Sequence, residues 1–151
     1  GVPDVPGKAA EIFTVVAKSG ANVDMIVQNV SAAATGRTDI SFTLPKSDAA
    51  TALRALASEQ AGIGFESLVH DDQIGKLSVV GAGMRTHSGV SATLFEALST
   101  AGVNIEMIST SEIRISVVLR GDDLAQAARV VHTAFGLDAE VEAVVHAGTG
   151  R

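Results

Sequence analysis

The 151-residue sequence contains no cysteine, no tryptophan and no tyrosine, and its only aromatic side chains are five phenylalanines. Without cysteine, the chain has neither disulfides nor thiolate chemistry. No signal peptide is recognisable, and no apolar run approaches the roughly 18 residues that a membrane-spanning helix needs. A net charge of −6 argues against a nucleic-acid or anionic-membrane surface. We therefore expect a cytoplasmic protein with aliphatic cores, no nucleic-acid partner and no membrane partner.

What the sequence does contain is a long internal repeat. Residues 83–108 repeat residues 1–26 at an offset of 82 positions, so that Gly89 matches Gly7. The other matching positions are Phe95 and Phe13, Gly102 and Gly20, Asn104 and Asn22, Glu106 and Asp24, and Met107-Ile108 and Met25-Ile26. A repeat of this length that occurs twice indicates two copies of a small domain. The polar segment 71–75 separates the copies, so we expect domains of residues 1–72 and 73–151.

Each copy shows strand and helix patterns in the same order. In the first copy, apolar residues at helical spacing predict a helix from Lys8 to Gly20, and a second helix begins at Ser47 or Asp48. The remaining patterns of the first copy predict strands at residues 22–30, 38–44 and 65–69. The second copy has predicted strands at 77–80, 103–108, 113–119 and 140–146. Its predicted helices are at 91–102 and 121–135.

The order strand-helix-strand-strand-helix-strand predicts an α+β fold of two ferredoxin-like domains in tandem. Each would be a four-stranded antiparallel sheet with both helices on one face. The first copy begins at the loop before its first helix and lacks the strand that the second copy has before that loop. Because this strand is central in the topology, we expect that the natural chain extends upstream of Gly1 or that a partner supplies the strand.

The sequence carries no catalytic constellation. The four histidines, at positions 70, 87, 132 and 146, do not stand at metal-ligand spacing with a second His, Asp or Glu. There is no nucleophile elbow and no phosphate-binding glycine loop that ends in Lys-Ser or Lys-Thr. We expect no catalytic residues, no metal and no cofactor in this chain.

A loop-to-helix junction at residues 4–9 has the clearest ligand-binding chemistry. Gly7 lets a small ligand approach the backbone, and a helix start offers free N–H groups to a carboxylate. Asp4, just before it, can pair with an ammonium group. Free amides beside a carboxylate suit an α-amino acid. The alternative is that Pro6-Gly7 only shapes a turn and Asp4 caps the helix.

Several segments resemble the regulatory region of aspartate kinases. They are VPDVPGKAAEIF, NVDMIVQNVS and TDISFT in the first copy and GAGMRTHSGV, VNIEMISTSEIRISV and the terminal AGTGR in the second. This region consists of tandem ACT domains and exists in some bacteria as a separate β subunit. The resemblance covers essentially the whole chain in the right order. It implies a regulatory function without catalytic residues, since these belong to the kinase domain that phosphorylates aspartate with ATP.

The resemblance also implies partners and an allosteric ligand. ACT domains of two chains form a homodimer with a continuous sheet, and a kinase-bearing α subunit or an upstream kinase domain is the further partner. Threonine, often together with lysine, binds at the ACT–ACT interfaces and inhibits the enzyme. The implied threonine-binding residues are Asp4, Gly7, Ala9, Asn22, Val23, Asp24 and Gln28 of one copy and Val90, Ser91, Asn104, Ile105 and Ser111 of the facing copy.

The two junctions differ in their side chains. Thr86 stands where the first copy has Asp4, and Ser88 stands where it has Pro6. The hairpin of the first copy is also seven residues longer, because Leu44 matches Leu119 at an offset of 75. We therefore expect the two junctions to bind differently.

Only the first junction carries a carboxylate for threonine's ammonium group, which we assign to Asp4. Backbone amides of the same chain would bind its carboxylate, and Gln28 would read its hydroxyl. A site built for a hydroxyl rejects valine, because its own polar groups would be left unpaired. Two other interpretations stay open: a structural dimerisation module without a ligand, and a small amino-acid-using enzyme, which the missing acid–base residues disfavour.

Overall fold

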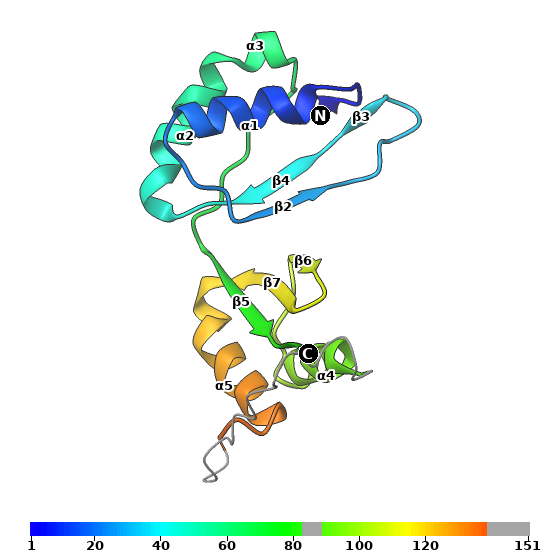
Figure 1. Cartoon of the computed structure of the whole chain (residues 1–151), viewed down its shortest axis with the longest axis vertical. Helices are drawn as coiled ribbons and strands as arrows, with labels where there is room; N and C mark the ends of the chain where they lie inside the picture. The colour runs from blue at the N-terminus through cyan, green and yellow to red at the C-terminus, as the bar shows by residue number, and fades with distance from the viewer. Residues whose placement is uncertain (83–88, 139–151) are drawn as a thin grey trace, which may run out of the picture. The chain divides into compact units, whose positions relative to one another are not determined.

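The computed structural model describes residues 1–82 and 89–138. The chain divides into two compact units, Gly1–Asp72 and Gln73–Arg151. Each unit has its own apolar core and its own antiparallel strands (Figure 1).

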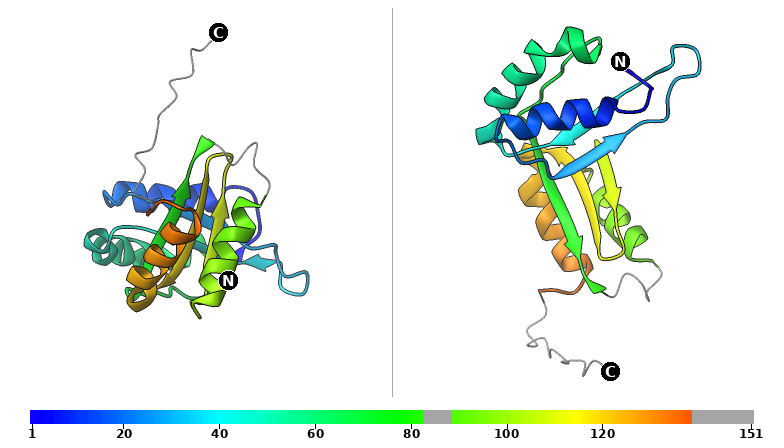
Figure 2. Two further views of the ribbon diagram at one scale, coloured as in Figure 1. Left: turned by 90° about the horizontal axis from the view of Figure 1, so that it is seen from below. Right: turned by 45° about the horizontal axis from the view of Figure 1, so that its top comes forward.

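The first unit carries two long helices and one short helix, together with short antiparallel strand pairs. Its elements in chain order are β1 (Val2–Pro3), α1 (Lys8–Lys18), β2 (Met25–Gln28), β3 (Arg37–Thr38), β4 (Ile40–Thr43), α2 (Lys46–Ser58) and the short α3 (Gln60–Ile63). β1 pairs with β3, and β2 pairs with β4. Helices α1 and α2 contact each other and cover the same face of β2 and β4 (Figure 2).

The second unit repeats this arrangement with longer strands. Its elements are β5 (Ile74–Val80), α4 (Val90–Thr100), β6 (Met107–Thr110), β7 (Arg114–Arg120), the 3-10 helix η2 (Gly121–Asp123) and α5 (Leu124–Ala134). β7 is the central strand, with β5 antiparallel on one side and β6 antiparallel on the other. This strand order and the two helices on one face confirm the predicted α+β fold of ferredoxin-like type.

The cores form because one stripe of each helix is apolar. In α1, Ile12 and Val16 are buried, and in α4 Leu94 and Leu98 are buried at the same three- to four-residue spacing. The strands contribute alternate residues to the same cores, which in β7 are Ile115, Val117 and Leu119. The second core has only aliphatic buried residues, whereas Phe65 joins the first, with Phe13 and Phe42 in edge-on contact at 5.4 Å beside it.

The prediction of a strand at residues 65–69 is wrong. Only Phe65 is buried there, while Leu68 and Val69 are 37% and 85% exposed. The carbonyl groups of Phe65 and Glu66 accept hydrogen bonds from the Gln60 side chain, at 3.3 and 3.0 Å. The Gln60 side chain therefore satisfies two backbone carbonyl groups that a neighbouring strand would otherwise pair with.

Other element boundaries also differ from the predicted ones. β5 begins at Ile74, inside the segment predicted as a polar connector, because Ile74 and Gly75 continue the ladder opposite Arg120 and Leu119. Neither Ser47 nor Asp48 caps α2, whose N-cap residue is Pro45. The predicted strand at 140–146 lies outside the described residues.

Strand β1 is two residues long and, at the offset of 82, matches residues 84–85, which come after β5, so it is not the counterpart of β5. In the described part of the chain, β4 pairs with β2 along one edge and no strand pairs along the other, whereas β7 is paired on both sides. Completion of this sheet by an upstream segment or by a partner stays a prediction.

The first helix of each unit begins after a glycine in the left-handed conformation. The N-cap residues Gly7 and Gly89 have φ angles of 101° and 102°. A Cβ is disfavoured there by about 1–2 kcal/mol. We expect Gly7→Ala to lower the free energy of unfolding in urea by about 1 kcal/mol. Gly62→Ala is the control, because Gly62 lies in α3 and alanine favours a helix. Equal losses for the two variants would contradict the strain at Gly7.

Candidate functional site

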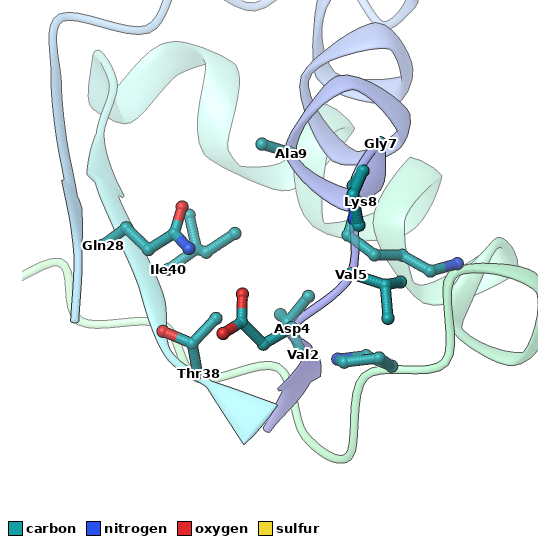
Figure 3. A pocket seen from close by; sticks show the side chains of 11 residues that line it. Val2, Asp4, Val5, Gly7, Lys8, Ala9, Gln28, Thr38 and Ile40 are labelled. Carbon is teal, nitrogen blue, oxygen red and sulfur yellow. The ribbon is translucent and has the colours of Figure 1, made fainter. Parts of the chain in front are cut away.

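A hollow of about 350 Å³ lies in the first unit, where the Asp4 loop and the start of α1 meet the strands (Figure 3). This volume is at the small end of the range typical of ligand pockets and suits a single small molecule. The hollow is lined by Val2, Pro3, Asp4, Val5, Pro6, Gly7, Lys8, Ala9, Gln28, Thr38 and Ile40. Four of the predicted binding residues are therefore brought together here, namely Asp4, Gly7, Ala9 and Gln28.

Asp4 and Gln28 are the two polar side chains that point into this space (Figure 3). The Asp4 loop is held by its backbone, since the N–H of Asp4 donates to the carbonyl of Gly36 at 2.9 Å. Within residues 1–82 and 89–138, neither the Asp4 carboxylate nor the Gln28 amide makes a hydrogen bond or an ion pair. Both groups are thus available to a ligand.

The start of α1 also lines the hollow and adds backbone hydrogen-bond donors to it. Its N-cap residue is Gly7, and no side chain caps the helix. The N–H of Lys8 donates to the carbonyl of Val5 at 3.4 Å. The other first-turn N–H groups have no partner within the helix, so they face outward as hydrogen-bond donors. The alternative in which Asp4 caps the helix is wrong, because Asp4 lies three residues before the N-cap position.

The opposite wall of the hollow offers no free polar group, and its residues were not among the predicted binding residues. Thr38 is 4% exposed, and its hydroxyl donates to the carbonyl of Asn29 at 2.6 Å. Val2 and Ile40 extend this wall. The two-residue period of the strand places positions 38 and 40 on one face and is the signal that points to them. Lys8 is oriented away from Asp4 in Figure 3, and its ammonium pairs with Glu11 at 2.7 Å.

Asn22, Val23 and Asp24 do not line the hollow. The N–H of Asn22 donates to the Asp48 carboxylate at 3.3 Å, Val23 packs against the first core, and the N–H of Asp24 donates to the carbonyl of Thr43 at 3.0 Å. These residues precede β2, whereas Gln28 is at its end. Four residues of strand span about 13 Å, so one small ligand in the hollow is out of their reach.

The other five predicted residues belong to the second unit. Val90 is the first residue of α4 and packs against the second core, as does Ile105 after the helix. Ser91 and Asn104 are exposed. The N–H of Ser111 donates to the carbonyl of Arg114 at 2.7 Å, which closes the turn between β6 and β7.

The described part of the chain shows neither a metal-binding cluster nor a membrane-spanning helix. No group of three His, Asp or Glu side chains in residues 1–82 and 89–138 is arranged to hold a metal ion. Over the same residues, every helix is too short or too polar to cross a membrane.

Comparison with known proteins identifies the family. The profile of the ACT domain matches residues 1–60 and 77–135. Among solved structures, the chain is similar to the aspartokinase alpha and beta subunits, with 46% identity, 90% of this chain and 88% of that chain covered, and a TM-score of 0.81. It is also similar to the ligand-free regulatory subunit of aspartate kinase from Thermus thermophilus, with 42% identity, 89% and 88% coverage, and a TM-score of 0.78.

The chain belongs to the ACT-domain regulatory regions of aspartokinases. The aspartokinase of Mycolicibacterium smegmatis is 51% identical over all 151 residues, and that of Corynebacterium glutamicum is 52% identical. The chain spans only 36% of the length of these curated relatives. This ACT region is therefore the regulatory part of such an enzyme, and the kinase domain lies outside it.

Proposed function

We propose that this ACT region binds threonine in the Asp4 hollow and thereby transmits feedback inhibition to a cytoplasmic aspartate kinase. The observation that supports this function most is the Asp4 carboxylate. It points without a partner among the described residues into a hollow whose neighbouring wall is an uncapped helix start. A carboxylate opposite backbone N–H donors matches the two charged groups of an α-amino acid.

The side chain of threonine fits the remaining walls. Its hydroxyl binds the amide of Gln28, and its methyl group contacts the apolar wall of Val2 and Ile40. Valine has the same size but no hydroxyl, so it leaves the Gln28 amide unpaired. A site built for a hydroxyl strongly disfavours such an analogue.

In a homodimer, threonine binding is coupled to the activity of the kinase. In this proposal Val90, Ser91, Asn104, Ile105 and Ser111 of a facing ACT domain close the site. A ligand that bridges two chains stabilises the inhibited arrangement, typically by about 1–3 kcal/mol per site. Two such sites in a dimer shift a balanced equilibrium strongly. Lysine acts as a second effector of the same region.

A thermal-shift titration of this ACT region tests the proposal. At 100 times its dissociation constant, a ligand adds about 2.7 kcal/mol to the stability of the folded state. For a chain of this size we expect threonine to raise Tm by several degrees. Valine is the matched control and should leave Tm unchanged. Equal shifts for threonine and valine would contradict hydroxyl recognition by Gln28. No shift with threonine, lysine or methionine in a folded dimer would favour a structural dimerisation module.

A further inference from the structure

Strand β1 leads into the Asp4 loop and is seated against the rest of the first unit. Its two residues, Val2 and Pro3, pair with Thr38 and Arg37 of β3. Val2 is 6% exposed and belongs to the first core. Proline lacks an N–H, so Pro3 donates no ladder hydrogen bond to β3.

Arg37 adds a side-chain restraint to this pairing. It lies on β3 opposite Pro3, and its side chain is 34% exposed. One guanidinium nitrogen, Nη1, donates to the carbonyl of Gly1 and also to that of Gly64, the latter at 2.9 Å. Nε pairs with the carboxylate of Glu66 at 3.0 Å. A single planar side chain thus joins the residue before β1 to the segment after α3.

The segment 64–66 is a firm anchor for this tie. Phe65 is 7% exposed in the first core, and the Gln60 side chain holds the carbonyls of Phe65 and Glu66. The N–H of Gly64 donates to the carbonyl of Gln60 at 2.7 Å. Gly1 lies so close to this segment that a Cβ on it would approach the Glu66 side chain to 2.8 Å. Arg37 therefore connects a short strand to a rigid part of the unit.

The second unit has no counterpart of this arginine. At the offset of 75 that matches Leu44 with Leu119, Arg37 corresponds to Glu112. The tie is specific to the unit that contains the hollow.

We propose that Arg37 is a positioning residue of the effector site. It does not line the hollow, but it holds β1 on β3 and so keeps the Asp4 carboxylate where it can bind a ligand. This role rests on the proposed function. If the loop were correctly placed only one tenth of the time, the apparent affinity would fall about tenfold. Lysine is a poor substitute, because its single ammonium cannot reproduce the planar fork of donors.

The first test needs no ligand and uses amide hydrogen exchange. In Arg37→Ala, the amide of Asp4 should exchange faster, since its bond to Gly36 depends on the seating of β1. The amide of Ile12, inside α1, should be unaffected. Arg54→Ala is the matched control, because it removes the same charge from an exposed site on α2. Arg37→Lys should lie between wild type and alanine, and it replaces the alanine variant if that does not fold.

The second test measures threonine affinity by calorimetry. Arg37→Ala should bind about tenfold more weakly, with Arg54→Ala as wild type. Unchanged exchange at Asp4 would overturn the proposal. Equal acceleration at Asp4 and Ile12 would also overturn it, because Arg37 would then support the whole unit. If the wild-type chain does not bind threonine, the proposed effector is wrong, while the exchange measurement still decides whether Arg37 positions the loop.

Discussion

Replacing Asp4 by asparagine is expected to weaken threonine binding about 30-fold. The change keeps the size of the side chain and removes the charge that pairs with the ligand's ammonium group. A hydrogen bond to a charged group contributes roughly 2 kcal/mol, and each 1.4 kcal/mol is a factor of ten in affinity. Asp4 is exposed, so the stability of the unliganded chain should change by less than about 0.5 kcal/mol. Calorimetric titration with threonine measures the effect.

The matched control is Asp122→Asn. Asp122 is an exposed carboxylate on η2 in the second unit, so the variant makes the same change in net charge. It should bind threonine as tightly as wild type. If Asp4→Asn also kept the wild-type affinity, the ammonium group would have to be bound by another residue.

The largest expected effect on stability comes from Leu98→Ala. Leu98 is 0% exposed on α4 and packs in the second core with Leu94 and Val131. Truncation removes buried methyl groups and leaves a cavity, which destabilises proteins by about 2–5 kcal/mol. We expect a loss of about 3 kcal/mol in urea unfolding. Leu137→Ala, at a side chain 65% exposed, should change the free energy of unfolding by less than about 0.5 kcal/mol. Comparable losses in the two variants would contradict the assignment of this core.

Much of the fold follows from patterns that are local in the sequence. Helical spacing of apolar residues predicts α1 and α4, and the glycines that end them, Gly20 and Gly102, do have positive φ angles. The prediction of a strand at residues 65–69 was wrong because the apolar residues Phe65, Leu68 and Val69 resemble a strand pattern, although only Phe65 is buried. What replaces the ladder there is a side-chain hydrogen bond from Gln60 to the carbonyl of Phe65, which a pattern of apolar residues does not encode.

The candidate site was predictable to the extent that its residues carry recognisable chemistry. Asp4 and Gly7 stand out as a carboxylate and a turn residue before a helix. Thr38 does not, since it lines the hollow as a nearly buried strand residue whose hydroxyl is already bound within the chain. Arg37 is harder still, because its partners Gly1 and Gly64 are 36 and 27 residues away in the sequence.

Gly7 and Gly89 hold nearly the same backbone angles, although Asp4-Val5-Pro6 precedes one and Thr86-His87-Ser88 precedes the other. Gene duplication therefore copied a backbone frame, and later substitutions altered the side chains in front of it. In such a lineage a change of ligand requires a few point mutations and leaves the architecture intact. Sensors for different metabolites can then evolve from one ancestor without passing through an unfolded intermediate form.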